Sequence, residues 1–223
     1  MNYTTVSKMF NQVTQQCNDR ELYFSKINDS WSGISGSEIR SIVKNLAFGL
    51  QSIEIGKGSN VALLSNNSPR WAMSDYGIIC SGAATVSVYP TLIASQIEYI
   101  INDSNSKVVI LENQEQLAKI HDIWNNCPQL SHVVVLDDSN ESEDSRIINF
   151  NDFMVIGSQF EEKSSSTFEN LINDYGNVSA EVAACRTSAA LFDFSFMFSV
   201  RVSGSASLDV IAQITDRNFL DMD

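Results

Sequence analysis

Short stretches of this sequence carry residue types that could do chemistry. One is Gly56-Lys57-Gly58-Ser59, which contains the glycine, lysine and hydroxyl types of a phosphate-binding loop. Such a loop has the form GxxxxGK[ST] and lies between a strand and the helix that follows it. Here the glycines come before a predicted strand. We therefore prefer a tight turn that uses the freedom of glycine at positive φ.

A second stretch, Asn66-Asn67-Ser68-Pro69, follows a predicted strand and opens a helix with an N-cap serine and a first-turn proline. In open α/β sheets, ligands gather at the carboxyl ends of the strands, so this position favours binding. Loop asparagines are also common at caps and turns because of local hydrogen bonds. We weigh that structural interpretation above the functional one.

The remaining chemical candidates do not form a site in the sequence. No GxSxG elbow is present, and His121 and His132 have no neighbouring acid and nucleophile pattern. Both histidines, and likewise Trp71 and Trp124, are interpreted as structural residues. The cysteines show no CxxC pair, which predicts reduced structural thiols at Cys17, Cys80, Cys127 and Cys185. We assign no catalytic, cofactor-binding or metal-ligating residue.

The elements that would position these residues alternate between helix and strand from Ser35 onward. Ser35 and Glu38 form a capping-box pattern, and apolar residues then repeat at helical spacing to Leu50. Further helices are predicted over 69–82, 91–103 and 114–124. Strands are predicted at Val61–Leu64, Ala84–Val88, Lys107–Leu111 and His132–Leu136. This order predicts an α/β fold with an open, mostly parallel sheet and helices on both faces.

Composition and charge limit the partners. The sequence is 43% hydrophobic, as in globular proteins, and carries a net charge of −13, which disfavours nucleic acid and anionic membrane surfaces. The most apolar window, 77–94, is too interrupted for a transmembrane segment. No secretory signal is seen at Met1–Phe10. We expect a cytoplasmic protein.

Two polar stretches break the pattern. The acidic run 137–144 is interpreted as a solvated loop. The serine-rich run 161–167 is interpreted as a flexible link. The predicted domains are therefore 1–160, a linker over 161–173, and a small incomplete α+β unit over 174–223.

A multi-motif match begins near Trp31 and ends near Gly157. It includes a glycine-led strand, an asparagine-rich turn with Asn67, Pro69 and Trp71, and the steps Ser81-Gly82-Ala83 and Val88 to Thr91. It continues through Cys127-Pro128-Gln129-Leu130 and HVVVLDD to a helix start at Phe150-Asn151-Asp152-Phe153. This region resembles the N-terminal part of AMP-forming long-chain acyl-CoA synthetases.

The resemblance implies a family that uses ATP and magnesium to form an acyl adenylate and then transfers the acyl group to coenzyme A. Its phosphate loop YTSGTTGxPKG, magnesium-side glutamate, ribose-binding aspartate and C-terminal lysine do not occur in this sequence. No cofactor is expected to be bound by this chain alone. The resemblance implies a scaffold and a wall of the acyl pocket, with no catalytic residue to carry over.

The last fifty residues resemble another family. Arg186 precedes LFDFS at Leu191 to Ser195, and a strand into Val202-Ser203-Gly204 and a TDR step at Thr215 to Arg217 follow. This pattern is similar to the start of the folate-binding aminomethyltransferase domain of glycine-cleavage T-proteins and dimethylglycine dehydrogenases. Phe196 stands where T-proteins usually have histidine. The family's catalytic aspartate would lie beyond Asp223.

Several functions remain open for the whole chain. The preferred interpretation is a truncated or fused remnant of a long-chain fatty acid–CoA ligase that is inactive alone. The alternatives are a non-catalytic binding or regulatory module, one part of a split ligase with a separate C-terminal half, and a folate-related fragment. A fatty acid or that missing half is the expected partner.

Overall fold

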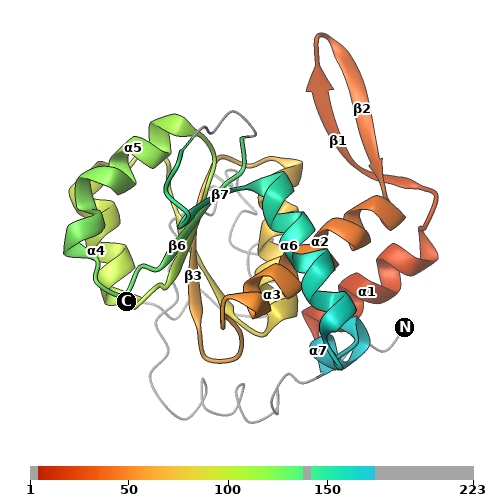
Figure 1. The fold of residues 1–223 in the computed structure, drawn as a ribbon. Coiled ribbons are helices and arrows are strands. Elements are labelled where there is room, and N and C mark those ends of the chain that lie inside the picture. The colour runs from red at the N-terminus through yellow and green to blue at the C-terminus, as the bar shows by residue number, and fades with distance from the viewer. Residues whose placement is uncertain (1–4, 138–141, 174–223) are drawn as a thin grey trace, which may run out of the picture. The chain divides into compact units, whose positions relative to one another are not determined.

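The computed structural model describes residues 5–137 and 142–173. They belong to a compact unit that spans Met1–Val178, and a second unit spans Ser179–Asp223. The aminomethyltransferase-like pattern at 174–223, with its expected α+β unit, lies outside the described residues. The described part is built around a five-stranded sheet with an attached N-terminal helix and hairpin (Figure 1).

The N-terminal elements were not predicted. Helix α1 (Val6–Gln16) is followed by strands β1 (Glu21–Ile27) and β2 (Ser30–Ser35), which pair as an antiparallel hairpin. The hairpin projects from the neighbouring helices (Figure 1). Its two turn residues, Asn28 and Asp29, have φ values of 47° and 63°. Positive φ at both central residues is the geometry of a type I′ turn, which asparagine and aspartate tolerate.

The central sheet confirms the predicted architecture. Its strands are β3 (Asn60–Leu64), β4 (Ala84–Val88), β5 (Val108–Leu111), β6 (His132–Val135) and β7 (Ile147–Asn149), in the order β4-β3-β5-β6-β7. All the pairings in this sheet are parallel. The first four strands were predicted, and their bounds agree within one residue. The short strand β7 was not.

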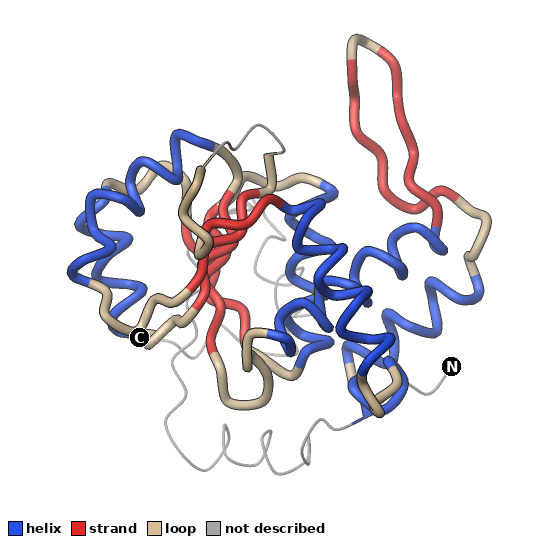
Figure 2. The backbone as a smooth tube through the Cα atoms, viewed as in Figure 1, coloured by secondary structure: helices blue, strands red, loops and turns tan. Residues whose placement is uncertain are grey.

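Helices cover both faces of the sheet, as predicted (Figure 2). One face packs on α4 (Ala94–Asp103) and α5 (Gln114–Ile123), which ends in a 3-10 turn at Trp124–Asn126. The other packs on α2 (Gly36–Ser52), α3 (Pro69–Ser81) and α6 (Phe150–Lys163). The capping box at Ser35 and Glu38 is present, and α3 begins at Pro69 with Ser68 as N-cap. Helix α4 begins later than the predicted residue 91, at Ala94.

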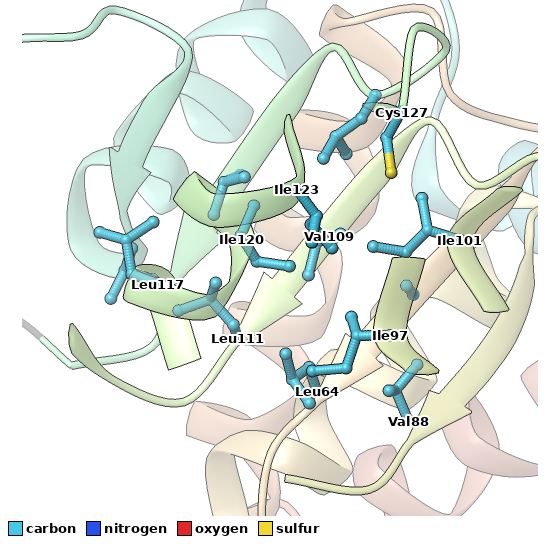
Figure 3. Packing of buried hydrophobic residues seen from close by; sticks show 14 of the residues in the cluster. Leu64, Val88, Ile97, Ile101, Val109, Leu111, Leu117, Ile120, Ile123 and Cys127 are labelled. Carbon is cyan, nitrogen blue, oxygen red and sulfur yellow. The ribbon is translucent and has the colours of Figure 1, made fainter. Parts of the chain in front are cut away.

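The central strands β3, β5 and β6 are buried on both faces, because each of their apolar side chains enters one of two cores. In β3, Ala62 and Leu64 lie in the core under α4 and α5, whereas Val61 and Leu63 lie in the core under α2, α3 and α6. Figure 3 shows the first core, in which Ile97, Ile101, Leu117 and Ile120 of the helices meet strand residues. Burial on both faces explains the continuous apolar runs seen in the sequence.

A third cluster joins α1, α2 and α3 to a short last helix, α7 (Phe168–Asn173). Phe168 and Ile172 are only 2% and 3% exposed. The expected link 161–173 is thus helical at both ends, because α6 continues to Lys163 and α7 begins at Phe168. The division of the chain into 1–160, 161–173 and 174–223 stays a prediction.

Candidate functional site

The strand order creates one position where connections leave a strand in opposite directions. After β3 the chain runs through α3 to β4 on one side, and after β4 it crosses back to β5 on the other side of β3. The carboxyl ends of β3 and β5 therefore meet at a topological switch point. In open α/β sheets, ligands bind in the crevice that such a switch creates.

The loop after β3 is held by its own hydroxyl and amide groups. Ser65 is buried, and its hydroxyl donates to the Asn66 carbonyl oxygen at 2.9 Å. Ser68 accepts a hydrogen bond from the Trp71 backbone N–H at 3.0 Å and so caps α3. This capping is the local role that the sequence favoured for the Asn66–Pro69 stretch. The cap also places the N-terminus of α3 at the switch point.

The loop after β5 locks onto the loop after β3 through one carboxylate. Glu112 Oε2 accepts from the backbone N–H of Asn66 at 3.0 Å and from its side-chain amide at 2.8 Å. The Glu112 N–H in turn donates to the Leu64 carbonyl at 3.0 Å, which continues the strand ladder. One oxygen of Glu112 therefore fixes the geometry of the asparagine turn.

The loop after β6 holds a cation of α3 at the same carboxyl edge. The Arg70 guanidinium donates to the carbonyl oxygen of Leu136, and its Cζ lies 5.1 Å from the centre of the Phe150 ring. Asp137 follows Leu136, and its N–H donates to the Glu112 carbonyl at 3.0 Å. A guanidinium and two carboxylates thus converge on the carboxyl edge.

These groups line a small cavity of about 260 Å³. Two hairpin residues, Ser25 and Ile34, also line it, although they lie far from the other lining residues in the sequence. A larger cavity of about 600 Å³ lies at the amino ends of β3 and β4, beside the 56–59 turn. We take the smaller cavity as the candidate site because it lies at the switch point, where charged and hydroxyl groups converge.

The other sequence candidates lie outside this site. Gly58 adopts a φ of 81° before β3, which confirms the turn interpretation of 56–59. His132 begins β6, at the amino end of the strand, and burial and the nearby Arg146 charge lower its pKa. His121 is exposed on α5. The Trp124 ring N–H donates to the Leu130 carbonyl at 3.2 Å, which fits the structural role predicted for that residue.

Cys17, Cys80 and Cys127 lie in the described residues, whereas Cys185 lies outside them. Cys17, Cys80 and Cys127 are free. Burial, followed by the Asp75 charge, raises the pKa of Cys80 to about 12, so this thiol is not a nucleophile at neutral pH. Over residues 5–137 and 142–173, no group of three histidine, cysteine or acidic side chains could hold a metal ion. No helix in that part is long and apolar enough to cross a membrane.

The cavity is lined by charged, hydroxyl and apolar side chains. Sequence reasoning found its Asn66–Pro69 loop and missed Glu112, Asp137, Arg70 and the hairpin residues. The available signal was that Glu112 and Asp137 each follow a predicted strand. The order of the strands in the sheet places these strand ends beside Asn66, and the sequence pattern does not predict that order.

Comparisons with known proteins agree with this fold. The chain is 28% identical over 160 residues to the long-chain fatty acid–CoA ligase ACSBG1 of Homo sapiens. This alignment covers 72% of this chain and 22% of the relative. It is 28% identical over 109 residues to the long-chain fatty acid–CoA ligase heimdall of Drosophila melanogaster, over 49% of this chain and 16% of that one. The chain thus spans about a fifth of these relatives.

Solved structures show the same fold. An anthranilate CoA ligase, AuaEII, in complex with anthranoyl-AMP, matches with a TM-score of 0.59 at 24% identity, over 69% of this chain and 27% of that chain. Coronafacic acid ligase from Pectobacterium brasiliense matches with a TM-score of 0.60 at 19% identity, over 67% and 29%. The family model described as AMP-binding enzyme matches residues 9–172. By this match the chain belongs to the AMP-binding enzyme family.

Proposed function

We propose that this chain is the N-terminal portion of an adenylate-forming ligase of the long-chain fatty acid–CoA type. The observation that carries the proposal is the family match over residues 9–172, together with relatives that are long-chain fatty acid–CoA ligases. In such an enzyme this portion would supply scaffold and one wall of the acyl pocket. Its partners would be a fatty acid and the rest of the ligase, in the cytoplasm.

We further propose that the 223 residues alone do not form an acyl adenylate. Within residues 5–137 and 142–173, no three histidine, cysteine or acidic side chains gather at one place to hold a metal ion. The sequence also has no glycine-rich loop of the family's form. Adenylyl transfer depends on charges fixed around the phosphates, so its main source of rate acceleration is missing here.

The test is fatty acid-dependent exchange of labelled pyrophosphate into ATP by the purified chain. We expect exchange at the level of a blank without protein, across short, medium and long acyl chains. An intact long-chain ligase assayed in parallel shows that the conditions support the reaction. Exchange above the blank would refute the proposed inactivity while leaving the family membership intact.

The ligase origin has a separate test. Transcripts from the source organism are read across codons 161 to 174 and past codon 223. We expect at least one transcript in which the reading frame continues into the phosphate loop of the family. If every transcript lacks that continuation, the chain is a remnant and not a portion of a working ligase.

A further inference from the structure

Strand β4 has one hydrogen-bonding edge that no strand of the described residues uses. It is an outer strand of the sheet, and the Ala84 N–H donates to the Ser59 carbonyl at 2.9 Å, toward β3. Because backbone groups alternate along a strand, Val86 also points to β3, whereas Thr85 and Ser87 point their N–H and C=O groups outward. Within residues 5–137 and 142–173, no strand pairs with that outer edge.

This edge lacks the usual protection against strand pairing. Natural edge strands are shortened, bulged, or marked by charged residues or proline. The opposite edge strand, β7, has only three residues. Strand β4 has five, ATVSV, with no charge or proline and with a regular register against β3. Ser87 is exposed. An open edge of this kind is a template for another strand.

The sequence of β4 is complementary to itself in the antiparallel direction. A two-fold axis at Val86 places Thr85 opposite Ser87 of a second copy, and each such pair exchanges both N–H···O=C bonds. Threonine–serine and valine–valine pairs are favourable cross-strand neighbours. The chain carries a net charge of −13, yet none of that charge lies on β4, so pairing creates no like-charge contact within the strands.

Exposed apolar side chains extend the surface beyond the strand. Tyr89, directly after β4, is 43% exposed, and Ile93, before α4, is 63% exposed. A five-residue strand with these two side chains after it offers at most a small interface, which implies reversible association.

We propose that β4 is a self-association surface, on which a second copy of this chain adds its own β4 in antiparallel orientation. The two sheets then form one continuous sheet across the two-fold axis. The edge selects an extended, uncharged strand with hydroxyl and β-branched side chains, and β4 of another copy is such a strand. Because each copy carries the same charge sign, salt screens the repulsion between the copies and strengthens the dimer.

Sedimentation equilibrium of the full chain tests this with Ser87→Pro. Proline removes only the outward N–H of residue 87, so the ladder to β3 stays whole, as is usual for proline on edge strands. Ser87→Ala is the matched control because it keeps that N–H. We expect a dimer with a dissociation constant of about 1–100 µM for the unchanged chain and Ser87→Ala, raised by about tenfold or more in Ser87→Pro.

Hydrogen exchange of the unchanged chain supplies a readout that does not depend on folding of a variant. The amides of Thr85 and Ser87 should exchange more slowly at high protein concentration than at low concentration. The amides of Ala84 and Val86, which face β3, should not change. A monomer at all concentrations, a dimer that Ser87→Pro leaves intact, or outward amides that are protected at every concentration would each overturn the proposal.

Discussion

Gly157 lies where α6 crosses α2, and the backbones meet there without room for a side chain. A Cβ atom on this residue would overlap the Asn45 carbonyl oxygen and lie 2.9 Å from the Gly49 backbone nitrogen. Both obstacles are main-chain atoms of α2, so they cannot move away as a side chain would. The packing of the core under α2, α3 and α6 depends on this close approach of the two helices.

We expect Gly157→Ala to lower the free energy of unfolding by about 3 kcal/mol, since overpacking against backbone forces the helices apart. Urea denaturation followed by circular dichroism measures this change. Gly58→Ala is the control, because no atom lies within 4 Å of its Cβ position and only its positive φ of 81° is strained. That strain costs about 1 kcal/mol. Equal losses in the two variants would contradict the packing argument.

Asp75 makes a second residue-scale prediction, on the pH dependence of stability. Burial raises the pKa of this carboxyl above its ordinary value of 3.8. The folded state therefore holds the proton more tightly than the unfolded chain. The stability that this residue contributes is fully present at low pH and is lost as the pH rises through the folded pKa.

Asp75→Asn removes the charge, so we expect the variant to be more stable than the unchanged chain at pH 7. The difference should disappear toward pH 3, where Asp75 is protonated in both states. Urea midpoints between pH 3 and 8 measure it. Asp122→Asn, on the exposed side of α5, is the matched control and should shift the midpoints little. A destabilised Asp75→Asn variant at pH 7 would show that the charge is needed.

Only part of the candidate site could be predicted from residue types. The Asn66–Pro69 loop was predicted at the end of a strand because the apolar run and the cap are local signals. Glu112 was missed, although its carboxylate holds the Asn66 amide. The two residues lie 46 positions apart, and only the pairing of β3 with β5 brings them together. Site residues from different strands require the sheet order, which is a property of the whole core.

Among the elements, those with strong local signals were predicted and those with weak ones were not. The α2 helix has a capping box and an apolar repeat, and both are present in the structure. The β1–β2 hairpin was missed even though Asn28-Asp29, two residues that tolerate positive φ, stands between runs that contain aromatic residues. Strand β7 has three residues, too few for a periodic pattern to emerge.

The capping box gives the element-scale prediction. The Ser35 hydroxyl accepts from the Glu38 N–H at 3.3 Å, and Glu38 Oε2 accepts from the Ser35 N–H at 2.9 Å. Ser35→Ala should lower the free energy of unfolding by about 1 kcal/mol, because a helix donor loses its partner. Ser41→Ala, on the exposed face of the same helix, should leave stability equal or slightly higher. Thermal melts of both variants measure the contrast.

At the scale of the whole molecule, the family match and the packing end at the same place. The match runs from residue 9, in α1, to residue 172, in α7. These two helices belong to one apolar cluster, in which Phe10 and Phe168 are both buried. The Ser7 hydroxyl also donates to the Ile172 carbonyl at 3.5 Å. The two ends of the matched region therefore close one outer layer over α2 and α3.

This closure predicts that α7 belongs to the folded α/β unit and that residues 161–167 are not its boundary. Phe168 and Ile172 are buried, the Arg40 Cζ lies 5.6 Å from the centre of the Phe168 ring, and the Arg40 guanidinium contacts Glu169 at 2.9 Å. A chain ending at Lys163 loses both apolar side chains, whereas one ending at Asn173 keeps them. We expect the shorter chain to be less stable by roughly 4 kcal/mol, from the burial of two large side chains. The partly exposed Arg40–Glu169 pair should contribute little to that difference.

Urea denaturation of the two truncated chains measures the difference, and Phe168→Ala in the longer chain separates the ring from the rest of α7. That variant should lose about 3 kcal/mol, because removal of a buried aromatic ring leaves a cavity in the cluster that also holds Phe10 and Phe48. Val155→Ala is the matched control, since Val155 is 56% exposed on α6 and its truncation should change stability little. Equal stability of the chains ending at 163 and 173 would mean that α7 is dispensable and that the folded unit ends with α6. A large loss would instead make α7 the closing element of this part of the AMP-binding fold, since it seals the layer that α1 begins.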